Sequence, residues 1–316
     1  MSSIIVSLAV GLLLLYVGAE GLVRGSASLA LRFGLTKLAV GLTIVAFGTS
    51  SPELVVSVKA ALDGNGAISL GNVIGSDICN IALILGLSAL VRPLKVNAQV
   101  VRIQIPIMIG ATFALALMLL DGRLQRLEGL GLFGGIIVYT WFSIYLARKE
   151  ASKSLKGELD PTFQIRARKT WLDGLFILTG LAALVVGGGL FISGAVSLAE
   201  TLGVNQAVIG LTIVAAGTSI PELATSLVAS IRKEGDIAVG NVVGSNIFNI
   251  FGILGIAALL RPIEMGGIQT ADLIVMIVVA ILILPMARTG FTLTRWEGTI
   301  LLAVYSGYIY YLLKAI

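Results

Sequence analysis

Long apolar runs dominate this sequence and restrict the folds that it can adopt. Hydrophobic residues make up 57% of the 316 positions and charged residues only 12%, far from the balance of a soluble domain. In lipid every backbone polar group needs an internal partner, so spanning segments are helices or closed β-barrels. Barrel strands alternate in hydropathy, whereas these runs are continuous. We therefore predict an all-α integral membrane protein.

The runs predict ten transmembrane helices. A helix needs about 20 residues to cross the hydrocarbon core, with a range of about 17 to 25. The predicted spans are 3–23, 38–62, 68–91, 99–120, 127–147, 171–195, 205–231, 237–260, 271–288 and 296–314. The first run is too long for the core of a signal peptide, so we expect it to remain as a helix.

The two halves of the chain repeat one another. With a fixed offset of 169 positions and no gaps, residues 41–93 match residues 210–262 at roughly 31 of 53 positions. The agreement includes Pro, Glu, Asn and Gly, which a shared apolar composition does not explain. Each half holds five predicted spans, an odd number, so the second half enters the membrane from the opposite side. The sequence predicts two inverted five-helix repeats, 1–147 and 171–316, joined by a solvated linker, 148–170.

Lys and Arg indicate how the chain is oriented. Most of the 22 basic residues fall on one predicted side of the membrane, the side of the 148–170 linker. Loops rich in Lys and Arg stay in the cytoplasm. We therefore expect a multi-pass protein of the cell membrane with a cytoplasmic linker and both termini extracellular. The net charge of +5 follows from this distribution and does not indicate nucleic-acid binding.

Each half carries an acidic motif inside an apolar run. Residues 48–53 read GTSSPE, and residues 217–222 read GTSIPE. Proline has no N–H and its ring clashes with the preceding turn, so the second and seventh predicted helices are broken there. A charge in the hydrocarbon core costs between about 2.5 and 17 kcal/mol, and such groups usually line ion paths. Two carboxylates, Glu53 and Glu222, therefore predict a shared cation site near the middle of the membrane.

A second pair of motifs follows on the third and eighth predicted helices. Residues 71–80 read GNVIGSDICN, and residues 240–249 read GNVVGSNIFN. In each, a Ser and an Asn four positions apart share a helix face. Together with the hydroxyls and backbone carbonyls of the acidic motifs they form an all-oxygen set, which suits hard cations such as Ca²⁺. The alternative is that these amides and hydroxyls only bond between helices.

These motifs resemble the paired α-repeats of the calcium/cation antiporter superfamily, in its prokaryotic sodium/calcium exchanger branch. The resemblance covers nearly the whole chain. It implies a secondary active antiporter that exchanges Ca²⁺ for Na⁺, usually three Na⁺ per Ca²⁺ and electrogenic, by alternating access. It also implies that the long first and sixth helices slide across a core of helices 2, 3, 7 and 8. The implied ligands are Ala46, Thr49, Ser50, Glu53, Ser76, Asn80, Ala215, Thr218, Ser219, Glu222, Ser245 and Asn249, with the two alanines acting through their carbonyls.

One departure from some relatives leaves the stoichiometry open, and one unmatched acid leaves its own role open. Certain relatives carry an acid at one of the positions of Asn80 and Asn249, and this chain carries an amide at both. Asp77 is an acid without a mate, because Asn246 stands at the equivalent position. We expect Asp77 to face away from Asn80; a structural role and a direct role with an ion or proton both stay open. An H⁺/Ca²⁺ antiporter of the same fold is the near alternative.

Other classes of function fit the sequence less well. Inverted halves with midplane carboxylates favour alternating access over a channel. The chain has no His and a single Cys, so no arrangement of nucleophile and base for an enzyme is evident. We expect no cofactor, and as partners only small inorganic cations and membrane lipid. A monomer suffices for such a function.

Overall fold

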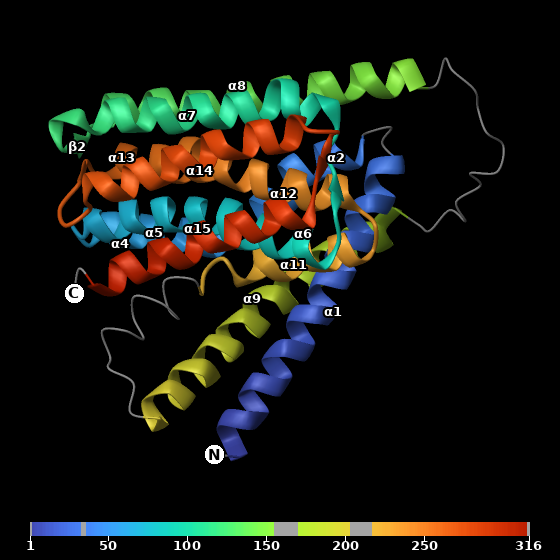
Figure 1. The fold of residues 1–316 in the computed structure, drawn as a ribbon, viewed down its shortest axis with the longest axis horizontal. Coiled ribbons are helices and arrows are strands. Elements are labelled where there is room, and N and C mark those ends of the chain that lie inside the picture. The colour runs from blue at the N-terminus through green and yellow to red at the C-terminus, as the bar shows by residue number, and fades with distance from the viewer. Residues whose placement is uncertain (1, 33–35, 155–169, 203–216, 315–316) are drawn as a thin grey trace.

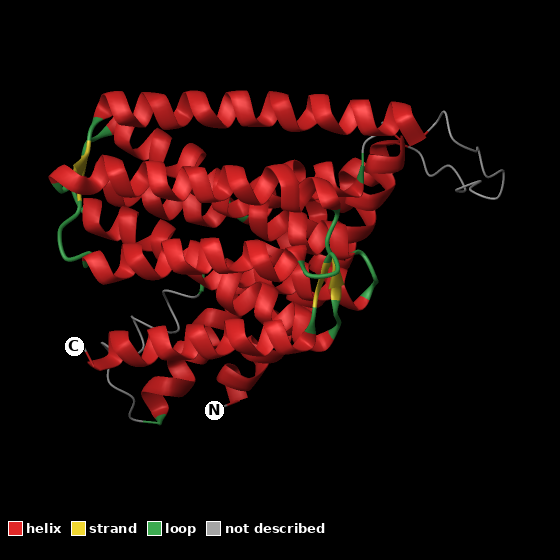
Figure 2. Cartoon of the chain, turned by 45° about the horizontal axis from the view of Figure 1, so that its top comes forward, coloured by secondary structure: helices red, strands yellow, loops and turns green. Residues whose placement is uncertain are grey.

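The computed structural model describes residues 2–32, 36–154, 170–202 and 217–314. In this part the chain is nearly all-helical (Figure 2), which confirms the predicted class apart from four strands of two residues each. Seven of the described helices are long and apolar enough to span a membrane, or eight if a bent pair counts as one span. The prediction of ten spans stays a prediction. The predicted span 205–231 begins outside the described residues.

Two long helices form a layer of their own. Helices α1 (Ser2–Arg32) and α9 (Thr170–Thr201) run side by side and project from the rest of the bundle (Figure 1). Both exceed the predicted spans 3–23 and 171–195. They touch through glycines: a Cβ at Gly18 would lie 2.8 Å from the Gly180 carbonyl oxygen. Small residues let helix backbones approach this closely in membranes.

The centre of the bundle is built from interrupted helices. Their side chains are mostly buried, whereas α1 and α9 are mostly exposed. Proline, glycine and π-type turns divide these segments, as expected where polar groups meet inside a membrane protein. The elements are α2 (Lys37–Val40), η1 (Gly41–Val45), α3 (Ala46–Thr49), α4 (Ser51–Leu62), α5 (Gly66–Ile78), η2 (Cys79–Leu85), α6 (Gly86–Val91), α11 (Ile220–Ile231), α12 (Gly235–Phe248), η6 (Asn249–Leu254) and α13 (Gly255–Leu260).

The remaining elements lie around this centre. In Figure 1, α8 runs along one side of the bundle, and α14 and α15 lie nearer the middle. The elements are β1 (Leu94–Lys95), η3 (Val100–Gln104), α7 (Ile105–Met118), η4 (Leu119–Asp121), β2 (Arg123–Leu124), α8 (Arg126–Ser154), β3 (Ile263–Glu264), α14 (Thr270–Arg288), β4 (Thr292–Leu293) and α15 (Arg295–Lys314).

Contacts between the halves recur with the same offset of 169 as the sequence repeat. Strand β1 pairs with β4, with Leu94 opposite Leu293, and β2 pairs with β3, with Leu124 opposite Ile263. The side chain of Arg126 donates to the Leu260 carbonyl (3.5 Å), and its equivalent, in α15, donates to the carbonyl at the end of α6 (3.4 Å). The repeat therefore reaches beyond sequence similarity to equivalent contacts.

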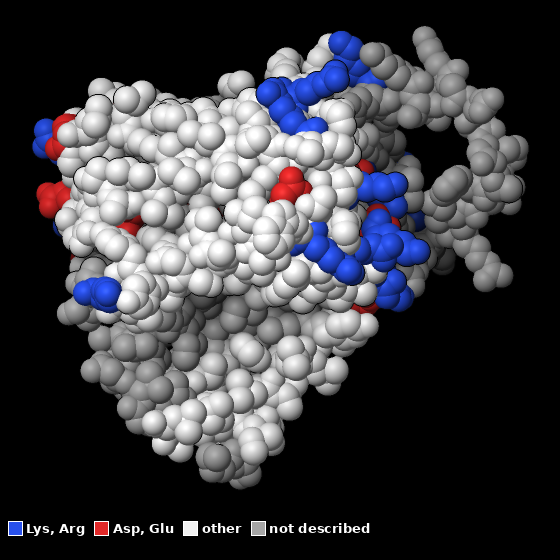
Figure 3. Space-filling view, viewed as in Figure 1, with Lys and Arg blue, Asp and Glu red and all other residues white. Residues whose placement is uncertain are grey.

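Basic side chains gather at one end of the described bundle (Figure 3). They include Lys37 at the start of α2, Arg92 after α6, Lys233 after α11 and Arg295 at the start of α15, which line a common pocket. The opposite end carries fewer basic and several acidic side chains on the face shown. The two ends of the bundle therefore differ in their number of basic side chains.

Candidate functional site

The chain breaks in the same way before each buried glutamate. Ser50 caps α4 with φ −81° and ψ 8°, and Ser219 caps α11 with φ −86° and ψ 8°. A proline lies in the first two positions of each following helix, where its missing N–H costs nothing. The chain bends by 48° between helical segments 37–49 and 51–62, which confirms the predicted break in the second helix. The segment before Gly217 lies outside the described residues.

The two breaks bring the glutamates together. Ser50 Oγ donates to Glu222 Oε1 (2.8 Å), and Ser219 Oγ donates to Glu53 Oε1 (3.1 Å). Each serine lies three residues before the glutamate of its own half, so the crossed bonds hold both carboxyl groups at one place. Glu53 is 1% exposed and Glu222 0%, and neither faces the outer surface. The predicted convergence of the two halves is present in the structure.

Two asparagines that the sequence analysis did not assign support the breaks. Asn72 Nδ2 donates to Ser57 Oγ (2.9 Å) and to the Glu53 carbonyl (3.3 Å). Its equivalent Asn241 donates to Ser226 Oγ (3.0 Å) and to the carbonyl of the second glutamate (3.5 Å). Both lie in the Gly-Asn pair that opens the second motif of each half. This repetition is the sequence feature from which their role could have been predicted.

The asparagines also face the threonines of the opposite half. Thr49 Oγ1 lies 3.1 Å from Asn241 Oδ1, and Thr218 Oγ1 lies 3.3 Å from Asn72 Oδ1. The Thr49 hydroxyl also lies 3.1 Å from the Val45 carbonyl oxygen, and it has one proton to donate. The hydroxyl oxygens of both threonines therefore lie at the site, and their lone pairs are available to a cation.

The two predicted backbone ligands, the carbonyls of Ala46 and Ala215, are not shown to be unpaired. The Ala46 carbonyl is buried and accepts the Ser50 N–H (3.0 Å), so the break does not leave it without a partner. A carbonyl oxygen keeps a second lone pair for another contact. Ala215, its equivalent, lies outside the described residues.

The asparagines of the second motifs bond across the halves as well. Asn80 Nδ2 donates to Asn246 Oδ1 (3.0 Å), and Asn249 Nδ2 donates to Asp77 Oδ1 (2.9 Å). Asp77 is 1% exposed. It lies in the buried centre, and its bond to Asn249 supports the structural role that the sequence left open.

Six buried oxygens of the predicted ligand set have no hydrogen-bond partner among the described residues. They are Glu53 Oε2, Glu222 Oε2, Ser76 Oγ, Ser245 Oγ, Asn80 Oδ1 and Asn249 Oδ1. Buried polar atoms are normally paired, so a group of orphans points to an ion or water that satisfies them. Ca²⁺ takes six to eight oxygen ligands, mixing carboxylates with neutral oxygens. The donor set therefore fits a hard cation.

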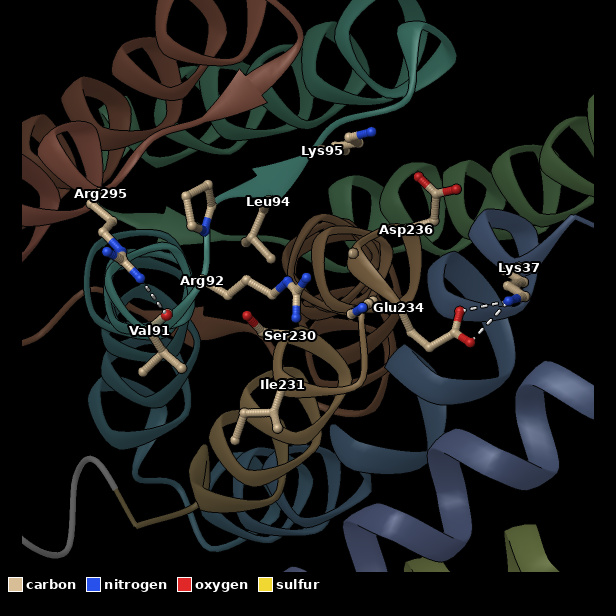
Figure 4. Close-up of a pocket in the computed structure, with 13 residues that line it drawn as sticks. Lys37, Val91, Arg92, Leu94, Lys95, Ser230, Ile231, Glu234, Asp236 and Arg295 are labelled. Atoms are coloured by element: carbon tan, nitrogen blue, oxygen red, sulfur yellow. Dashed lines mark hydrogen bonds and ion pairs between the residues drawn. The ribbon is translucent and has the colours of Figure 1, made fainter.

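A pocket of about 910 Å³ opens elsewhere, at the basic end of the bundle (Figure 4). Its lining includes Arg92, Lys95 and Lys233, and it includes none of the predicted ligands. Lys37 bonds Glu234 across it at 2.8 Å. This pocket is therefore separate from the carboxylate pair, which is enclosed by helices.

The sequence matches the family model described as "Sodium/calcium exchanger protein" over residues 3–145 and 173–314. The chain belongs to the sodium/calcium exchanger protein family. It is 36% identical over 315 residues to the putative antiporter CaxA of Alkalimonas amylolytica, covering 97% of each chain. It is 33% identical to the sodium/calcium exchanger MaX1 of Methanosarcina acetivorans, covering 96% of each.

A solved structure of the sodium-calcium exchanger NCX_Mj, soaked without Na⁺ and Ca²⁺, has the same fold. It superimposes with a TM-score of 0.84 at 32% identity and covers 98% of this chain and 99% of its own. Family membership and the apolar helices together make this a multi-pass membrane protein. The predicted resemblance is confirmed at the level of the family.

Proposed function

We propose that this exchanger-family protein moves Ca²⁺ against Na⁺ at a site built on Glu53 and Glu222. The observation that carries this proposal is the crossed pair of serine–glutamate bonds, which ties one acid from each half to the break of the other. Of the six orphaned oxygens, two belong to the glutamates themselves, and the four on serine and asparagine side chains supply neutral ligands. Both the relative MaX1 and the solved NCX_Mj are named as sodium/calcium exchangers.

The ligand set is the predicted one: Ala46, Thr49, Ser50, Glu53, Ser76, Asn80, Ala215, Thr218, Ser219, Glu222, Ser245 and Asn249. Two carboxylates give the site a charge of −2 when both are ionised. One Ca²⁺ neutralises this charge, whereas three Na⁺ leave +1. Exchange of three Na⁺ per Ca²⁺ then carries one net charge per cycle, worth about 2.3 kcal/mol per 100 mV.

We further propose that the chain spans the membrane ten times as inverted repeats, 1–147 and 171–316, with a cytoplasmic linker at 148–170 and both termini outside. Equivalent contacts at the fixed offset support the repeat, and the concentration of basic side chains supports the orientation. The α1–α9 pair is the moving layer in this account. Its tight glycine contacts make it one unit that shifts against the buried centre.

An H⁺/Ca²⁺ antiporter on the same site is the second candidate. The observation that favours it is a third buried carboxyl group, Asp77, bonded to the predicted ligand Asn249. Proton coupling requires a group that takes up a proton when Ca²⁺ leaves, and a carboxyl group at the site can do so.

Transport by the purified protein in liposomes separates these candidates. Vesicles loaded with Na⁺ and diluted into Na⁺-free medium with ⁴⁵Ca²⁺ are expected to accumulate calcium, faster with the interior held positive than negative, because three Na⁺ leaving for one Ca²⁺ entering carry one net positive charge outward. Vesicles with choline in place of Na⁺ serve as the control. Uptake that ignores Na⁺ and follows an imposed pH gradient would select the proton-coupled alternative, and no uptake under either gradient would exclude both.

A further inference from the structure

Asp77 makes the two halves unequal at the proposed ion site. It lies on α5 next to Ser76, and its equivalent in the second half is Asn246. Each of these side chains accepts a hydrogen bond from an asparagine of the opposite half, Asn249 in one case and Asn80 in the other. The two bonds are equivalent by position. One acceptor is a carboxyl oxygen and the other is an amide oxygen.

The acceptors determine which way the ligand amides point. Asp77 Oδ1 is the acceptor in this bond, so Asn249 turns its NH₂ group to Asp77 and its own Oδ1 away. The backbone carbonyl of Asp77 also only accepts, and it holds Asn246 Nδ2 at 3.1 Å. Asn246 is thereby left with its Oδ1 free to accept from Asn80. The side chain of Asp77 thus orients one ligand amide, and its carbonyl orients the other through Asn246.

The amide atoms that remain without a hydrogen bond are the oxygens, which are the atoms that a cation binds. Asn80 Oδ1 and Asn249 Oδ1 are buried and have no partner in the described part of the chain. An amide oxygen attracts a cation, whereas the NH₂ group repels it, so a flipped amide replaces a ligand by an unfavourable dipole. Groups that orient metal ligands from behind affect metal affinity by about 10- to 100-fold in other proteins.

We propose that Asp77 is a positioning residue that holds Asn249 with its oxygen toward the transported cation. The proposal rests on the proposed function of the site. It assigns Asp77 no contact with the ion. The second half achieves the same orientation with an amide acceptor, so the acceptor rather than its charge is what the site needs.

Substitution at Asp77 tests this role. Asp77→Ala removes the acceptor, and we expect the apparent KM for Ca²⁺ to rise about tenfold while uptake at saturating Ca²⁺ changes by less than about twofold, as for lost binding rather than lost turnover. Asp77→Asn retains an amide oxygen as acceptor, as at Asn246, and is expected to restore the KM to within about threefold of wild type. Equal impairment of both variants, or a wild-type KM in Asp77→Ala, would contradict the proposal.

A double-substitution cycle tests whether Asp77 acts through Asn249. In an Asn249→Ala background, Asp77→Ala is expected to raise the KM no further, because the oriented amide is already gone. Independent, additive rises would overturn the proposal. Thr112→Ala is the matched control, since that buried hydroxyl bonds only the Met108 carbonyl of its own helix (2.9 Å). If Asp77→Ala does not fold, the KM of Asp77→Asn decides alone.

Calorimetric titration of the detergent-solubilised protein with Ca²⁺ keeps this test separate from that of the proposed function. Wild-type protein that binds Ca²⁺ but exchanges no ions would refute the function and leave the positioning role to be judged by binding. We expect the same order of affinities as in transport: wild type, then Asp77→Asn, then Asp77→Ala.

Discussion

The two halves of the molecule agree at the carboxylates and differ beside them. Around Glu53 and Glu222 the serine and asparagine bonds have their equivalents, from the crossed serines to the asparagines behind each break. On the neighbouring helix, α5, the first half has Asp77 where the second half has Asn246 on α12. The comparison teaches that the shared geometry belongs to the acids and their serines. The difference beside the acids lies in a group that orients a neighbouring amide, Asp77 in one half and Asn246 in the other.

The largest effect is expected at the acids. Glu53→Gln and Glu222→Gln each remove one of the two charges, and we expect either to reduce Na⁺-driven Ca²⁺ uptake at least about 100-fold. The glutamine keeps the shape, so the melting temperature in detergent should change little. If one variant transports normally while the other is inactive, the equivalence of the halves at the acids is broken.

A smaller and equal effect is expected at the serines. Ser50→Ala and Ser219→Ala each remove a hydrogen bond to a carboxylate, worth about 1.5–3 kcal/mol, so we expect Ca²⁺ affinity in either variant to fall by about ten- to a hundredfold. Calcium titrations of the two variants, with Ser51→Ala as control, check this; Ser51 is partly exposed and donates to the Phe47 carbonyl of α3, not to a glutamate. Affinities that differ by more than tenfold between the variants would show that the crossed bonds are not equivalent.

The glycine contacts between α1 and α9 come next. Gly18 and its equivalent Gly187 each face the other helix, and a Cβ on either would lie about 2.8 Å from it. Alanine at either position forces the helices apart, so we expect the melting temperature to fall and exchange to slow by severalfold, equally in both. Gly189→Ala is the control, because nothing lies within 4 Å of its added Cβ. An unchanged exchange rate in Gly18→Ala would contradict the proposal that α1 and α9 move together as one layer.

The smallest effect is expected at an ion pair without an equivalent. Glu20 on α1 pairs with Arg24 on the same helix and with Arg232 after α11. Partly exposed pairs contribute about 0–1 kcal/mol. Glu20→Gln should therefore lower the melting temperature by only a few degrees, measured against Arg24→Gln, which removes only the pair within α1. A large loss in Glu20→Gln alone would show that this contact between α1 and Arg232 contributes more than a partly exposed ion pair.

The sequence predicted the convergence of Glu53 and Glu222 because a gapless repeat forces equivalent residues into equivalent places. It also predicted the break at Pro52, which follows from the missing N–H of proline. It did not predict the bonds of Asn72 or the contact of Asp77 with Asn249. Those depend on the register between neighbouring helices, within one half for the Asn72 donor bonds and across the halves for Asp77 and Asn249, which spacing along one helix does not determine.

Helix lengths show the same limit. Apolar runs end where side chains become polar, but α1 and α9 continue beyond the predicted 3–23 and 171–195. Backbone hydrogen bonds extend a helix as readily through polar residues as through apolar ones. The π-type segments, such as η2, were likewise not predicted, since their local composition does not differ from that of the α-helices around them.

The most direct test of the central claim is a crystal structure of this protein soaked with Sr²⁺ or Ca²⁺, with the ion located by anomalous scattering. We expect one strong peak at about 2.3–2.6 Å from a carboxylate oxygen of both Glu53 and Glu222, with Asn249 Oδ1 turned toward it. A peak bound by one glutamate alone, or none between the two, would contradict a site shared by the two halves.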